Sequence, residues 1–105
     1  MAETSPRPNL LWRLFVVVGI GTMTAVTVDD SAWEAFDDAT GGTLNRDAIR
    51  TMLVGTAALH AAEGASAYVA ARRSGVARPA RWGLATFMWG FPVLFRLRKA
   101  ERLAA

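Results

Sequence analysis

The chain has 105 residues, of which 52% are hydrophobic and 20% charged, and its formal net charge is +3. This length predicts a single domain, and so apolar a composition is unusual for a small soluble protein. No cysteine is present, which excludes disulfides and thiolate metal sites. The arginines gather at the edges of apolar runs, which argues against nucleic-acid binding. We therefore expect an all-α fold, a small integral membrane helical bundle with three membrane segments.

The first apolar run covers residues 10–28, and Arg13 is the only charged residue within it. Its length is close to the about 20 residues that a helix needs to cross the hydrocarbon of a bilayer. The sequence AVTVDD that ends the run is a poor cleavage site for a signal peptidase. We therefore expect an uncleaved membrane helix.

Residues 29–49 form the longest polar stretch and are predicted to be an acidic extracytoplasmic loop. Ser31 and Glu34 have the spacing of a capping box, which predicts a short helix at residues 32–39. The glycine pair at 41–42 would end this helix.

Two aromatic residues of the short helix, Trp33 and Phe36, are three positions apart and are expected to share one face. An aromatic pair beside carboxylates is typical of a helix that rests on a membrane surface or on a partner. The acidic residues of the loop lack the ligand spacing of an EF-hand. We therefore expect a solvated acidic loop and no metal site.

The second apolar run, at residues 50–71, is predicted to be a second membrane helix dominated by small residues. Two series of small residues repeat every four positions: Ala57, Ala61 and Ala65, and Ala58, Ala62 and Ser66. Such a pattern brings membrane helices into close contact. We therefore expect this helix to pack on more than one side.

His60 and Glu63 share a face of the second helix because they are three residues apart. If the helix reaches the cytoplasmic surface near residue 71, a rise of about 1.5 Å per residue places His60 near the midplane. An ionised carboxylate at such depth is costly unless it is paired, and Arg13 could reach Glu63. We predict a polar cluster of His60, Glu63, Arg13 and Tyr68 that fixes helix register or contacts a lipid headgroup, a substrate or a partner.

A basic turn, residues 72–81, leads to a third segment at residues 82–98. The apolar part of this segment is short for a crossing and contains Gly90 and Pro92. If the segment re-enters, the positive-inside rule places the acidic loop outside; if it crosses, the rule gives no preference. Both arrangements stay open, and in both we place the amino terminus and the basic turn in the cytoplasm.

The second half of the chain carries a recognisable motif. It consists of HAAE at residues 60–63, then Tyr68, Gly75 and Arg81, and then Trp82, Leu84, Thr86, Phe87 and Gly90. This pattern resembles the domain of unknown function 4499 family of small three-helix membrane proteins, which are similar to transmembrane protein 254. The resemblance implies a helical bundle whose third segment crosses the membrane, although Pro92 interrupts a stretch that is continuous in the family. It implies almost no biochemistry.

The motif residues also have a packing interpretation, which we favour over a ligand site. Thr86 can bond to its own helix backbone, Trp82 can mark an interface, and Gly90 can admit a neighbouring helix. On this interpretation the residue types at the other motif positions are also set by packing between helices.

These features together predict a non-catalytic accessory or structural subunit of a larger membrane complex, in the cell inner (plasma) membrane, multi-pass, with no cofactor. The expected partners are membrane lipids and a larger integral membrane protein, with a homo-oligomer as another form and no nucleic acid. The Ala, Arg and Gly usage suggests a GC-rich bacterium, in which a lipid transporter of the mammalian-cell-entry type is the host we consider. The alternative is a membrane enzyme or lipid-binding protein that uses His60 and Glu63 on a hydrophobic substrate. Two potential ligands are fewer than a catalytic zinc takes from protein, and no nucleophile lies beside them.

Overall fold

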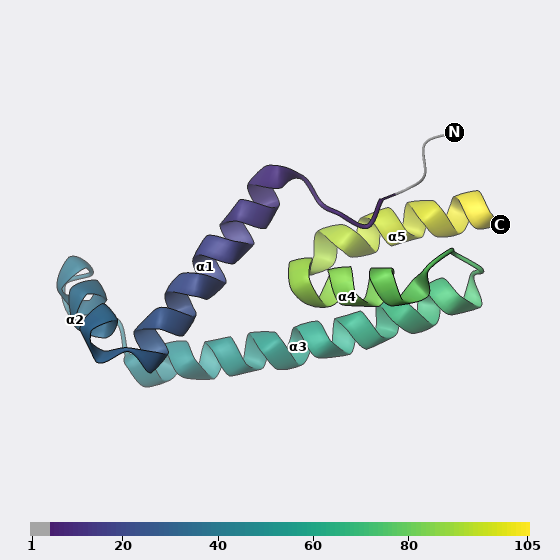
Figure 1. Ribbon diagram of the computed structural model, residues 1–105. Helices are drawn as coiled ribbons and strands as arrows, with labels where there is room; N and C mark the ends of the chain where they lie inside the picture. The colour runs from purple at the N-terminus through teal and green to yellow at the C-terminus, as the bar shows by residue number, and fades with distance from the viewer. Residues whose placement is uncertain (1–4) are drawn as a thin grey trace.

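The computed structural model describes residues 5–105, which form five α-helices without any strand in that range. The helices are α1 (Leu10–Val28), α2 (Asp30–Ala39), α3 (Arg46–Arg73), α4 (Pro79–Trp89) and α5 (Phe91–Ala104). Figure 1 shows α3 as one long rod, with α1 and α2 at its amino-terminal end and a hairpin of α4 and α5 along its carboxyl-terminal half. The prediction of an all-helical fold is confirmed.

Helix α1 has the predicted bounds. The side chain of Asn9 caps its amino terminus by accepting a hydrogen bond of 2.8 Å from the backbone N–H of Trp12. Within residues 5–105, α1 is the one helix that is both long and apolar enough to cross a membrane, and little of it is buried in the fold. Signal sequences share this length and composition.

Helix α2 begins two residues earlier than predicted, because Asp29 and not Ser31 is its cap. The Asp29 carboxylate accepts a hydrogen bond of 2.9 Å from the backbone N–H of Ala32. Ser31 lies in the first turn, and its hydroxyl donates to the same carboxylate. The predicted capping box is therefore wrong. Asp29 is the better cap because its carboxylate accepts these bonds and its negative charge interacts favourably with the positive end of the helix dipole.

The carboxyl end of α2 agrees with the sequence. Gly41 and Gly42 adopt φ values of 72° and 70°, which glycine tolerates and other residues avoid. The rings of Trp33 and Phe36 lie 6.0 Å apart, so the two aromatic residues share a face as expected.

Helix α3 is longer at both ends than the predicted range of 50–71. Asn45 caps its start by accepting a hydrogen bond of 3.1 Å from the N–H of Ala48. The prediction followed hydropathy alone, whereas this cap and the charged first turn extend the helix beyond the apolar run. The more buried residues recur every three or four positions along it and include Arg46, Ile49, Leu53, Thr56, His60, Glu63, Ala67 and Ala70.

The close contact between α3 and α4 is made by two glycines. A Cβ atom on Gly64 would lie 2.9 Å from the carbonyl oxygen of Gly83, and one on Gly83 would lie 3.0 Å from that of Gly64. The two predicted small-residue series of α3 are exposed in the chain. Within the chain, close packing through small residues is therefore made by Gly64 and Gly83, and the two predicted series take no part in it.

The third predicted segment, residues 82–98, is two helices rather than one. The backbone turns at Gly90, with φ 77° and ψ −147°, and Pro92 lies in the first turn of α5. Figure 1 shows α5 folding back beside α4, so the carboxyl terminus lies near the carboxyl end of α3. With 11 and 14 residues, neither helix has the length of a bilayer crossing.

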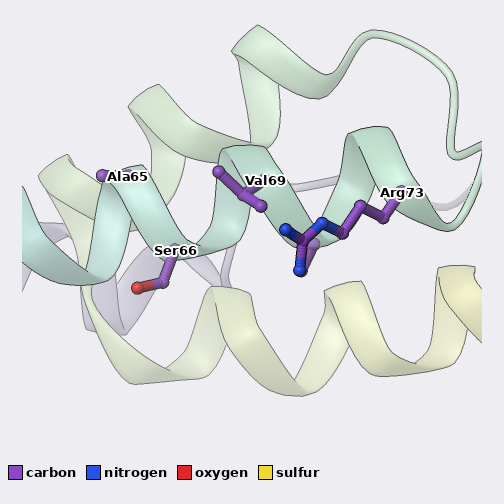
Figure 2. A pocket seen from close by; sticks show the side chains of 5 residues that line it. Ala65, Ser66, Val69 and Arg73 are labelled. Carbon is purple, nitrogen blue, oxygen red and sulfur yellow. The ribbon is translucent and has the colours of Figure 1, made fainter.

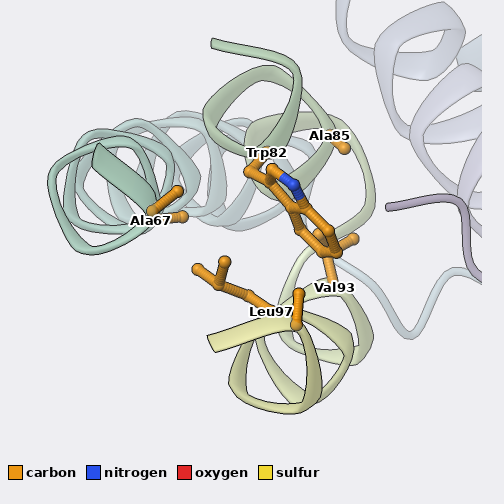
Figure 3. Packing of buried hydrophobic residues seen from close by; sticks show 7 residues of the cluster. Ala67, Trp82, Ala85, Val93 and Leu97 are labelled. Carbon is orange, nitrogen blue, oxygen red and sulfur yellow. The ribbon is translucent and has the colours of Figure 1, made fainter. Parts of the chain in front are cut away.

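The main apolar core lies between the hairpin and α3 (Figure 3). It is formed by Ala67, Ala71, Trp82, Ala85, Val93, Leu97 and Ala100. Trp82 is its largest member and is 3% exposed. Helix α1 contributes no residue to this cluster, so the hairpin and α1 are held together by other contacts.

Candidate functional site

The site predicted around His60 lies at the carboxyl end of α4. The break at Gly90 leaves the last carbonyl groups of α4 without partners in a continuing helix. The Nδ1 atom of His60 lies 2.8 Å from the carbonyl oxygen of Phe87. A carbonyl can only accept, so Nδ1 carries the proton and donates it. His60 therefore caps the end of α4 from the neighbouring helix α3.

The histidine ring lies beside the backbone of Gly90, at the turn between α4 and α5. A Cβ atom on Gly90 would lie 3.4 Å from both Cε1 and Nε2 of His60. The imidazole is thus within contact distance of the point where α4 ends and α5 begins. The feature of this position that favours glycine is its positive φ of 77°.

Trp12 caps the same helix end from α1. Its indole Nε1–H donates a hydrogen bond of 2.7 Å to the carbonyl oxygen of Trp89. Its ring meets that of Phe91 edge to face, with centroids 5.1 Å apart. Sequence reasoning missed Trp12, and the available signal was an indole donor in the first turn of an otherwise apolar helix.

Glu63 and Arg13 are not joined as predicted. The ion pairs among residues 5–105 are Arg46–Asp30 and Arg50–Asp47. The Nε atom of Arg13 is buried and has no hydrogen-bond partner in that part of the chain. Figure 1 shows α1 diverging from α3 toward the amino terminus of α1, and Arg13 belongs to the first turn of α1.

Tyr68 is 37% exposed and packs against α4. Its Cβ atom is 3.0 Å from the place where a Cβ of Gly83 would lie, so it contributes to the glycine contact. The structure therefore does not bring His60, Glu63, Arg13 and Tyr68 into one hydrogen-bonded cluster within the described residues. His60 alone makes a specific polar contact.

The five motif residues at positions 82–90 divide into two groups. Trp82, Thr86 and Gly90 face the interior, and the hydroxyl of Thr86 donates a hydrogen bond of 2.8 Å to the carbonyl oxygen of Trp82. This bond within the helix was predicted and is confirmed. Leu84 and Phe87 are 62% and 44% exposed. The motif thus contributes both to the core and to an outward apolar face.

Two arginines of α3 cap the carboxyl end of α1. Nε of Arg46 donates to the carbonyl oxygen of Val26 at 2.9 Å, and a guanidinium nitrogen of Arg50 donates to that of Thr27 at 3.1 Å. Arg46 also binds the Asp30 carboxylate at 2.7 Å. Cations at the carboxyl end of a helix interact favourably with the negative end of the helix dipole. The hydrogen bonds also satisfy carbonyl groups that have no partner within the helix. Sequence reasoning missed this contact.

A shallow hollow of about 410 Å³ lies on α3 and is lined by Ala65, Ser66, Val69, Ala70 and Arg73 (Figure 2). Its lining is mostly apolar, with one hydroxyl and one guanidinium. Among residues 5–105, no three His, Cys, Asp or Glu side chains are placed to hold a metal ion. The hollow therefore lacks the converging polar groups that typify a catalytic pocket.

A scan of protein-family models, a search of curated proteins and a search of solved structures each found no match to this chain. The resemblance to the domain of unknown function 4499 family therefore stays a prediction that depends on the motif residues. Of those residues, His60, Trp82, Thr86 and Gly90 meet at or beside α4 in the structure.

Proposed function

We propose that the chain is a non-catalytic structural subunit of a larger membrane assembly. The observation that carries the proposal is the hydrogen bond from His60 to the Phe87 carbonyl. The only imidazole of the chain is used to join helices, and Glu63 is not positioned with it as an acid–base pair by any hydrogen bond among the described residues. A role in architecture accounts for His60 without a substrate.

The exposed face of α1 supports anchoring in a bilayer. Leu11, Phe15 and Val18 are 79%, 68% and 65% exposed, and further apolar residues of α1 accompany them. A contiguous apolar surface of this kind marks contact with a membrane or a partner. In the proposed arrangement α1 crosses the inner membrane, α3 accompanies it, and the short α4–α5 hairpin re-enters from the cytoplasmic side.

The charge distribution supports the proposed orientation. Residues 72–105 hold eight of the 12 lysines and arginines, whereas residues 29–49 hold six of the nine acidic residues. The hairpin returns the carboxyl terminus to the basic end, so the positive-inside rule favours a cytoplasmic basic end and an acidic loop outside.

The exposed small-residue series of α3 support a partner. A helix surface of alanine and serine gains little from lipid but allows another helix to approach closely. A larger membrane protein or a second copy of the chain could supply that helix. A lipid transporter of the mammalian-cell-entry type stays a prediction for the host.

Gentle purification tests the proposal. The chain is extracted in mild detergent, and its native mass and companions are measured by native mass spectrometry. We expect a defined assembly that Ala61→Leu on α3 disrupts, whereas the matched Ala25→Leu change on the exposed face of α1 preserves it. A chain that runs as a monomer without companions contradicts the proposal. An intact assembly of a His60→Asn variant that has lost turnover or lipid binding would support the enzyme alternative.

A further inference from the structure

Helix α5 has two different faces. Val93, Leu97 and Ala100 are buried against α3 and α4. The opposite face carries Phe91, Phe95, Arg98 and Arg102, which are spaced by four, three and four residues and are all exposed. Along the outward face the residues change from aromatic near Gly90 to basic near the carboxyl terminus.

The aromatic end of this face is continuous with the start of α1. Four rings form a chain, which we call the aromatic ribbon: Phe15, Trp12, Phe91 and Phe95. Successive centroids are 5.7, 5.1 and 6.0 Å apart. Phe15, Phe91 and Phe95 are 68%, 55% and 63% exposed. A tryptophan at the end of an apolar helix, such as Trp12, is typical of the boundary between hydrocarbon and headgroups, and the three phenylalanines are apolar enough to lie on its hydrocarbon side.

The basic end of the face lies just beyond the ribbon. Arg98, Lys99 and Arg102 are exposed, and none belongs to an ion pair within residues 5–105. At about 1.5 Å per residue they lie roughly 4 to 10 Å farther along α5 than Phe95. A headgroup layer is about 5 to 8 Å thick on each side of the hydrocarbon. The distance along α5 from Phe95 to the cations is therefore similar to the distance from the edge of the hydrocarbon to the phosphate groups.

We propose that the aromatic ribbon and these three cations form a docking surface for anionic phospholipids of the leaflet at the amino-terminal end of α1. Phe91 and Phe95 enter the edge of the hydrocarbon, and the cations meet the phosphate and glycerol headgroups. The inference rests on the proposed anchoring through α1. A lipid surface is favoured over a protein because Trp12 and Phe15 belong both to the ribbon and to the helix that would cross the bilayer.

The absence of cysteine from the sequence makes the test direct. Single nitroxide labels are placed at Val18→Cys, Phe95→Cys and Arg102→Cys in the full chain, reconstituted in phosphatidylcholine nanodiscs with and without phosphatidylglycerol. Collisions with oxygen report lipid exposure, and collisions with a nickel chelate report water exposure. We expect labels at residues 18 and 95 to meet oxygen preferentially and the label at residue 102 to meet the chelate.

A second measurement isolates the cations. The Arg98→Gln, Lys99→Gln, Arg102→Gln triple variant is compared with the equally charged Arg72→Gln, Arg73→Gln, Arg78→Gln control. Phosphatidylglycerol retained after purification is measured by mass spectrometry, together with helicity as a check on folding. We expect several-fold less retained phosphatidylglycerol in the first variant and a smaller loss in the control.

The outcomes separate the docking surface from the membrane anchor. A water-exposed label at residue 95 beside a lipid-exposed label at residue 18 overturns the docking surface alone. A water-exposed label at residue 18 overturns the anchor as well. A label at residue 95 shielded from both reagents means that a second copy covers the ribbon, which contradicts lipid docking. Equal phosphatidylglycerol retention in the two folded triple variants shows that the α5 cations do not select anionic lipid.

Discussion

His60 and Phe87 are 27 residues apart in the sequence, and the imidazole Nδ1 of one lies 2.8 Å from the carbonyl oxygen of the other. This bond joins α3 to the broken end of α4, where Trp12 of α1 donates to the carbonyl of Trp89. Three helices thus meet at the end of α4, where the last carbonyl groups have no partner within their own helix. The ring nitrogens of His60 and Trp12 hold α3 and α1 to the end of α4.

Replacing His60 separates a structural role from a catalytic one. His60→Ala leaves the Phe87 carbonyl without its donor and should lower the free energy of unfolding by about 1 kcal/mol. His60→Asn should recover most of this loss, because the amide nitrogen of asparagine lies near the place of Nδ1. Denaturant titration in mixed micelles, followed by circular dichroism, measures both. Equal losses in the two variants would count against the helix-capping role.

The glycine contact between α3 and α4 has a matched control within α3. Gly64→Ala places a methyl group 2.9 Å from the Gly83 carbonyl oxygen and should cost about 1 to 3 kcal/mol of unfolding free energy. Gly55 has no atom within 4 Å of an added Cβ, so Gly55→Ala should be neutral or stabilise by up to about 1 kcal/mol. The same titration measures the difference, and two equal effects would refute the close contact.

Gly90→Ala tests the turn of the hairpin. At φ 77° an alanine is strained, whereas its Cβ would meet the His60 ring at an ordinary contact distance of 3.4 Å, so the expected cost comes from the backbone. We expect a loss of about 1 to 3 kcal/mol and a looser hairpin. The separation of nitroxide labels at residues 84 and 98, measured by pulsed electron resonance, should broaden in the variant. Gly21→Ala on α1, where an added Cβ meets nothing within 4 Å, serves as the control; an unchanged distance distribution for Gly90→Ala would contradict the prediction.

Arg46→Met tests the cap at the carboxyl end of α1. The variant keeps an unbranched apolar stem but loses the bonds to the Val26 carbonyl and the Asp30 carboxylate. A charged hydrogen bond to a helix end supports a loss of about 1 to 2 kcal/mol. Hydrogen exchange should accelerate at the last turn of α1 and the start of α2. Arg98→Met, which breaks no ion pair among residues 5–105, should leave this exchange unchanged.

The sequence was sufficient for features that depend on local chemistry. The bounds of α1 follow from an apolar run between Asn9 and Asp29, two residues whose side chains cap helices. The end of α2 at a glycine pair and the bond within α4 from Thr86 are also local. Each depends on a continuous run, a cap or a contact within four positions, so the local sequence predicts it.

Features that depend on which helices meet were not predictable in the same way. Alanine recurs around most of α3, so several small-residue series looked equivalent, and only the position of α4 selects Gly64. The proposed partnership of Arg13 and Glu63 assumed that α1 lies antiparallel to α3 and beside it along its whole length, whereas α1 diverges from α3. The role of His60 became visible only when Gly90 broke the third segment and left carbonyl groups to be capped.

The tautomer of His60 tests the central claim most directly. The chain contains one histidine, so the nitrogen-15 spectrum of imidazole-labelled protein reports this residue alone. In mixed micelles, at a pH where the ring is neutral, we predict that the proton resides on Nδ1, because the Phe87 carbonyl requires a donor there. A proton on Nε2, or the rapid average of both tautomers that a free imidazole shows, would contradict the helix cap and the structural role built on it.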